Sequence, residues 1–126
     1  MSIVAEFRGR ILEVLELISN DRAQLEYSRI APHVDVPAEL FNQWDDSYHP
    51  DELEFCHRFS SAELAAVATF DALANLIADE TPQQLPPLGE FMKTSAWRQL
   101  SAGAARTLEE MNLTWRNGLL PPPTSL

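Results

Sequence analysis

An almost uncharged apolar segment in the middle of the chain sets the strongest limit on its fold. From Ala62 to Ala78, thirteen of seventeen residues are apolar. At its start, Ser60 and Glu63 have the spacing of a capping box, in which side chains and backbone N–H groups bond reciprocally at a helix start. A helix that is apolar on most of its surface is stabilised inside a bundle. We therefore expect residues 60–79 to form a buried central helix.

Other segments have the periodicity of amphipathic helices. Apolar residues recur on one face of residues 2–18 and at spacings of three and four in residues 95–112. We expect an all-α protein, a single compact bundle of four to six helices. The shorter predicted helices cover residues 21–29, 37–45 and 50–58, the last of which also alternates well enough to be a strand.

Capping residues, glycines and prolines predict where helices begin and where the domain ends. Asp21 followed by Gln24 resembles a capping signal for a second helix. Asn117 and Gly118 are typical of a helix end, and prolines follow them. The sequence therefore predicts a single helical domain over residues 1–117 and a proline-rich C-terminal tail over residues 118–126.

The charge of the chain is concentrated in its middle. The net charge is −10, yet between Arg29 and Lys93 there are twelve acids and one base, Arg58, so this part alone carries 1 − 12 = −11. Nucleic acids and anionic membranes bind clusters of basic residues. We therefore expect neither as a partner, and a basic protein partner instead.

Cysteine and glycine usage exclude several classes of site. Cys56 is the single cysteine and cannot form an internal disulfide. The four glycines lack the spacing of a phosphate-binding loop. Charged residues interrupt the apolar positions of the first eighteen residues, unlike a signal peptide or a membrane span. We expect a cytoplasmic protein with no cofactor.

The stretch NQWDDSYHPDELEFCH, residues 42–57, combines aromatic and acidic residues. Aromatic anchors ringed by charge are typical of a surface that captures a basic protein. An alternative stays open, in which Trp44 and Phe55 belong to the core and the acids only keep the chain soluble. The predicted partner-binding residues are Asp35, Glu39, Trp44, Asp45, Asp46, Tyr48, Asp51, Glu52 and Glu54.

The same stretch could instead hold a metal or acid–base site built on His49, His57 and neighbouring carboxylates. Neither HExxH nor paired CxxC spacing is present. We therefore expect no metal and no catalytic residue, and we expect Cys56 to be a small buried apolar residue. A third possibility is a self-associating helical scaffold, a homodimer formed through the apolar central helix.

Together these observations favour a non-catalytic, acidic protein-binding domain. In size and charge it resembles small acidic inhibitors and immunity proteins that block cationic nucleases or toxins, a resemblance of composition without a shared motif. The expectation depends on the central acids forming one outer surface. It also requires that four arginines do not fold back over them: Arg8, Arg22, Arg29 and Arg98.

Overall fold

The computed structural model describes the backbone of residues 3–80 and 88–116 and the side chains of residues 7–79 and 89–111. Within these ranges the chain is helical, without a strand, which confirms the predicted all-α bundle. Two of the helices are four-residue turns, so five longer ones build the fold. In chain order they are α1 (Ile3–Ser19), α2 (Asp21–Ile30), α3 (Val36–Ser47), α4 (Leu53–Cys56), α5 (Ser61–Glu80), α6 (Leu88–Phe91) and α7 (Ser95–Arg116).

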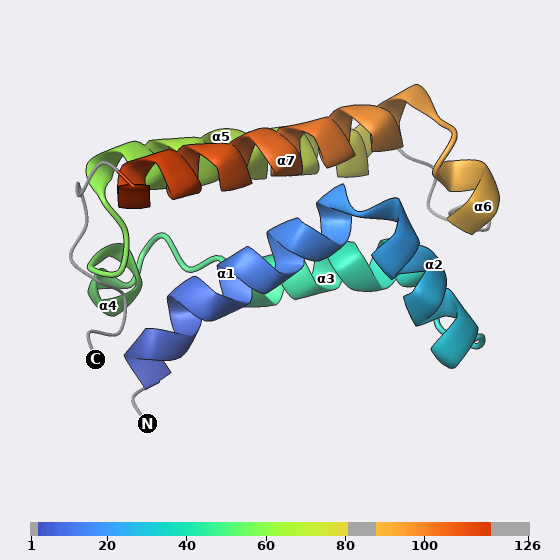
Figure 1. Cartoon of the computed structure of the whole chain (residues 1–126), viewed down its shortest axis with the longest axis horizontal. Coiled ribbons are helices and arrows are strands. Elements are labelled where there is room, and N and C mark those ends of the chain that lie inside the picture. Colours follow the sequence, from blue (N-terminus) through green and yellow to red (C-terminus); the bar gives the residue numbers. More distant parts are fainter. Residues whose placement is uncertain (1–2, 81–87, 117–126) are drawn as a thin grey trace.

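The helices form two layers (Figure 1). α5 and α7 lie side by side in one layer, and α1 lies with α3 in the other. α4 closes one end of the bundle, while α2 and α6 lie at the opposite end. α1 packs against α7, α3, α2 and α4, so the helix with the most neighbours is α1.

The position of α5 differs from the predicted central one. Its main contact is α7, and several of its apolar residues are exposed, including Leu76 with 57% of its surface accessible. The reason is side-chain size, because α5 is rich in alanine and each alanine buries little apolar area. α1 supplies the bulkier Ile11, Leu15 and Ile18, all buried, and takes the central place.

The capping box at the start of α5 forms as predicted and also binds α1. The backbone N–H of Ser60 donates to Glu63 Oε1 at 3.0 Å, and the N–H of Glu63 donates to Ser60 Oγ at 3.1 Å. Arg8 of α1 donates two hydrogen bonds to the Glu63 carboxylate, at 2.8 and 2.7 Å. Both Arg8 and Glu63 are buried, so this ion pair joins α1 to the first turn of α5 inside the protein.

Further contacts complete the surroundings of Arg8. Its Nη1 also donates to the carbonyl of Arg58 at 3.1 Å, and the guanidinium lies 5.6 Å from the centre of the Phe59 ring. A buried charge is tolerated when its donors are satisfied and its partner is well placed. Here one arginine connects α1, the end of the α4 segment and the start of α5.

A second buried polar contact joins α1, α2 and α7. Gln24 Nε2 donates to the carbonyls of Leu17 and Ile18 at 2.8 and 2.9 Å, and Gln24 Oε1 accepts from Trp97 Nε1 at 3.2 Å. The predicted cap at Asp21 is wrong, because Asn20 is the N-cap and accepts from the backbone of the third residue of α2. The Gln24 side chain therefore donates to carbonyls at the end of α1 and does not cap the start of its own helix.

The remaining helix predictions can be compared with the structure directly. The segment 50–58 is helical over four residues rather than a strand. Thr94 Oγ1 accepts from the backbone N–H of Trp97 at 3.2 Å and caps α7. The predicted tail, residues 118–126, lies outside the described residues, and so do residues 81–87, which precede α6.

α5 is also the one described helix whose length and composition would let it cross a membrane, over Ser61–Asp79. In this fold its two internal carboxylates are bonded to side chains of other helices. Glu63 binds Arg8 of α1, and Asp71 accepts from Trp44 of α3. These bonds fix α5 as one member of the helical bundle.

Replacing Gln24 by leucine is expected to lower the free energy of unfolding by about 2 to 4 kcal/mol, because buried hydrogen-bonding groups left without a partner cost about 1–3 kcal/mol each. The carbonyl of Ile18 and the indole N–H of Trp97 lose their bonds to Gln24. Urea unfolding followed by tryptophan fluorescence measures the change. Gln99→Leu on the exposed side of α7 is the matched control and should stay within about 0.5 kcal/mol of the parent; equal effects would contradict this role of Gln24.

Candidate functional site

Trp44 is a core residue and not a surface anchor. Only 1% of its surface is accessible, and its ring meets the Phe70 ring edge-on at 4.7 Å. Its Nε1 donates to Asp71 Oδ1 at 2.9 Å. Phe55 is also fully buried. For these two aromatics the structure supports the alternative of a core position, and the prediction that Trp44 contacts a partner is wrong.

Tyr48 is half-buried at the end of α3. Its ring stacks on Trp44 with centres 5.4 Å apart and meets the edge of Phe55 at 5.8 Å. Burial, and then the nearby charge of Asp71, raise the pKa of the Tyr48 phenol above its ordinary value. The raised pKa extends the pH range over which the phenol is neutral, and Tyr48 stays partly accessible beside the acids that follow it in the chain.

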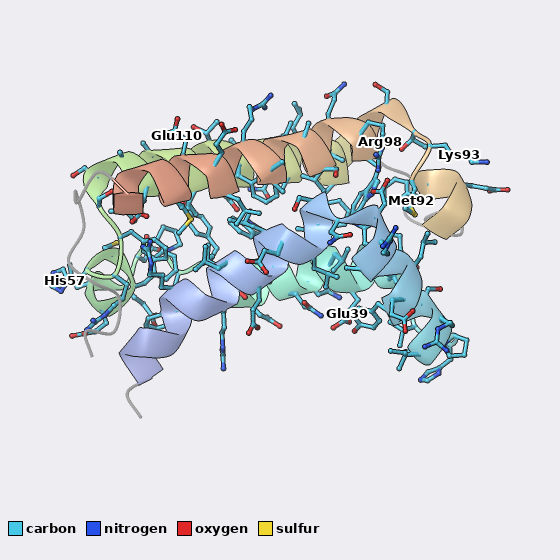
Figure 2. The ribbon with its side chains drawn as sticks, viewed as in Figure 1. Glu39, His57, Met92, Lys93, Arg98 and Glu110 are labelled. Atoms are coloured by element: carbon cyan, nitrogen blue, oxygen red, sulfur yellow. The ribbon has the colours of Figure 1, made fainter. Side chains whose placement is uncertain are left out.

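Asp35 and Glu39 belong to the other end of α3. Asp35 is the N-cap, accepting from the backbone of Ala38 at 3.3 Å, and Glu39 accepts from Gln43 at 3.4 Å. A twelve-residue helix is about 18 Å long, which separates these two acids from the α4 end of the bundle. Figure 2 shows Glu39 towards α2 and His57 at the opposite end. The predicted residues therefore do not form one face.

Five acids follow one another within ten residues, from the last turn of α3 to the first turn of α4, and we call them the acidic loop. Each of them is exposed. Leu53 lies within the same segment with 74% of its surface accessible, a large value for an apolar side chain. The acidic loop comprises Asp45, Asp46, Asp51, Glu52 and Glu54.

Among the described side chains, the arginines that form ion pairs bind acids elsewhere. The Nδ1 of His49 lies 4.0 Å from a carboxylate oxygen of Glu52, a member of the acidic loop. Arg10 lines a hollow of about 290 Å³ that Asp46 also borders, so one base lies near this edge of the loop. The arginine pairs are Arg8 with Glu63, Arg29 with Glu26 and Arg98 with Asp21.

Asp45 and Asp46 occupy the last turn of α3, which contains no basic residue. The carbonyl end of a helix carries partial negative charge, so two carboxylates there are unfavourable. Partial desolvation of its exposed side chain, and then the charges of Asp71 and Asp46, raise the pKa of Asp45. The chain therefore retains these acids at a cost in stability.

The histidines and the cysteine do not assemble into a metal-binding group in the described part of the chain. His49 Nε2 lies 2.7 Å from the carbonyl of Asp46, and its ring packs against Phe7. His57 is exposed and points away from the bundle in Figure 2. Cys56 is half-buried, with its thiol 3.4 Å from the carbonyl of Pro50. No group of three His, Cys, Asp or Glu side chains is close enough to hold a metal within these residues.

Two larger hollows lie away from the acidic loop. A groove of about 560 Å³ lies between α5 and α7, with Phe70 and Leu73 among its lining residues. A polar hollow of about 570 Å³ lies where α1 meets α2 and includes Arg22 and Arg98. Arg22 is thus placed beside α7 and not over the acidic loop.

The sequence did not lead us to expect an exposed apolar side chain at Leu53. It also led us to place Trp44 on the surface, whereas Trp44 is buried. The stretch around Leu53 alternates between apolar and polar residues, and alternation does not show which side of a four-residue turn faces outward. The signal that could have found it is the cluster of charges around Leu53, since acids on both sides in sequence favour an exposed segment.

Comparison of the chain with protein-family models, with curated proteins and with solved structures gave no match. The function proposed below therefore rests on the residues of the chain itself and on their arrangement.

Replacing Asp45 by asparagine is expected to raise the free energy of unfolding at neutral pH by about 0.3–1 kcal/mol, the usual effect of one charge at a helix end. Because its pKa is raised on folding, the folded protein binds the Asp45 proton more tightly than the unfolded chain, and ionised Asp45 destabilises the fold. The gain should shrink as pH falls through the folded pKa towards the unfolded one.

Urea unfolding over a series of pH values measures this gain. Asp51→Asn is the control, because Asp51 is exposed and lies outside the helices. A gain for Asp51→Asn equal to that for Asp45→Asn, or a gain that grows at low pH, would contradict the attribution of the gain to the raised pKa of Asp45.

Proposed function

We propose that this chain is a non-catalytic protein-binding domain and that its acidic loop docks on a basic protein. The observation that carries the proposal is a ten-residue segment with five exposed carboxylates and an exposed leucine, without a lysine or arginine ion pair among the described residues. Such a field attracts a cationic partner over a distance of several ångströms and speeds its association.

The placement of Asp45 and Asp46 supports a role beyond solubility. Exposed acids that only keep a protein soluble can lie anywhere on its surface, including helix starts, where they stabilise. These two lie at a helix end, where they destabilise. Local violations of favourable placement in natural proteins are expected at functional sites.

Leu53 and Tyr48 supply the apolar part of such a surface. Interfaces combine a few apolar or aromatic anchors with a surrounding polar rim. Leu53 is exposed between Glu52 and Glu54, and Tyr48 is held in place by its stack on Trp44. We propose that Leu53 enters a pocket of the partner while the carboxylates pair with its lysines and arginines.

The finer form of the proposal is an inhibitor or immunity-type protein that covers the active surface of a cationic nuclease or toxin. The support is the small size of the chain, its net charge of −10 and the concentration of acids in its middle. An enzyme that binds phosphates presents clustered basic residues, and a compact acidic face is their electrostatic complement.

The test begins with capture of proteins by the immobilised chain at low salt, followed by purification of the basic protein that binds. Its association rate with the free chain is then measured by stopped flow. We expect the rate to fall steeply as ionic strength rises, because salt screens steering between exposed charges. The triple reversal Asp45→Lys, Asp46→Lys and Glu52→Lys should slow association at least tenfold while the helical circular dichroism is unchanged.

The matched control carries the same change in net charge on exposed positions elsewhere: Glu16→Lys, Glu90→Lys and Glu109→Lys. Its association rate should fall much less than that of the acidic-loop variant. Equal losses in the two triple variants, or a rate independent of salt, would remove the acidic loop as the docking site. A Leu53→Ala variant should mainly speed dissociation, since apolar anchors act after encounter.

A further inference from the structure

The outer face of α5 carries a second apolar seam that no helix of the described chain covers. Its residues are exposed and recur at spacings of three and four, the pattern by which helices pack against one another. At 3.6 residues per turn the seam lies roughly 140° round the helix from the buried face of α5. The seam consists of Ala62, Ala65, Thr69, Ala72 and Leu76.

This face lacks charge over the length of the helix. Between Ser61 and Ala78 the exposed side chains of α5 are uncharged. Its two carboxylates in this span are engaged elsewhere, Glu63 with Arg8 and Asp71 with Trp44. In a chain with 22% charged residues, a solvated helix face of this length would normally carry several charges. An uncharged apolar face of this extent is typical of an interaction surface.

The outer face of α5 is not flat, because the seam borders a groove. The groove between α5 and α7 has a volume of about 560 Å³ and is bordered by Ala62, Ala66 and Leu73 on α5, with the charged Arg106, Glu109 and Glu110 on its α7 wall. Gly103 of α7 is packed closely there, because an added Cβ would lie 2.7 Å from Leu73 Cδ2. The small side chains on the α5 wall of the groove leave room for a larger side chain of a molecule that binds there.

We propose that the occupant is a second copy of this chain, with the two α5 helices antiparallel about a two-fold axis near Thr69. The axis sets Leu76 of each copy, seven residues from Thr69, against Ala62 of the other, also seven residues away. Leu76 is 57% exposed in the single chain and fits the space that Ala62 and Ala66 leave in the groove. The pairing is isologous, as a two-fold axis requires.

Charge at the ends of α5 supports this occupant and this direction. Asp79 is exposed at the carbonyl end, and Arg58 is exposed just before the amino end, where the helix dipole is positive. The antiparallel arrangement places Asp79 of each copy near Arg58 and the helix start of the other. A parallel arrangement would instead set Asp79 against Asp79.

The proposed self-association does not involve the acidic loop. The way each interaction changes with salt concentration distinguishes self-association from binding of a basic partner. Binding of a basic partner weakens as salt rises. Contact between two copies that each carry a net charge of −10 holds or strengthens, because salt screens their overall repulsion.

The first experiment is sedimentation velocity on the full chain over a concentration series at low and high salt. We expect a species of twice 14.2 kDa at the higher concentrations. Ala65→Glu places a charge on the seam and should return the protein to the monomer with unchanged helical circular dichroism. Ala105→Glu, at an exposed position of α7 that does not line the groove, is the matched control and should remain dimeric.

The second experiment tests the register by disulfide formation in a Cys56→Ser background. Thr69→Cys should give a covalent dimer on mild oxidation. Leu76→Cys should not, because two residues 76 would be separated by fourteen residues of helix, about 21 Å, far beyond the 4.4–6.8 Å that a disulfide spans.

Covalent dimers at both positions would overturn the antiparallel register. A parent chain that stays monomeric at every concentration and both salt levels would overturn the proposal. A monomer that floats with neutral phosphatidylcholine vesicles would also overturn it and assign the face to lipid.

Discussion

The buried ion pair between Arg8 and Glu63 is the interaction on which the arrangement of the layers depends. Glu63 closes the capping box of α5, and the same carboxylate receives both Arg8 hydrogen bonds from α1. A capping glutamate normally serves its own helix. Here it also joins α1 of one layer to α5 of the other, and removing either partner would leave a charge buried without compensation.

This use of arginine explains why the acidic loop keeps its charge. Arg8 forms its ion pair with Glu63 inside the bundle, while Arg29 and Arg98 bind acids of α2. The charge of the acidic loop is therefore left uncompensated both by one internal ion pair and by two surface pairs on α2. α5 shows the same relation for apolar area, since it buries one face in the bundle and leaves the other open.

Periodicity and capping signals predicted most of the fold, because they act within one helix. The capping box at Ser60 and the core stripe of α7 are examples. The roles of Gln24 and Trp44 could not be predicted, because each depends on a partner distant in sequence. For the candidate site, the sequence identified the acidic segment but not its division between the two ends of α3, which requires the helix to be placed in three dimensions.

A double-mutant cycle on Arg8 and Glu63 tests the central claim most directly. The free energies of unfolding of Arg8→Met, Glu63→Gln and the double variant are compared with that of the parent. If the pair joins the layers, each single change costs about 3–5 kcal/mol and the double change costs clearly less than their sum. Costs that simply add would contradict the account.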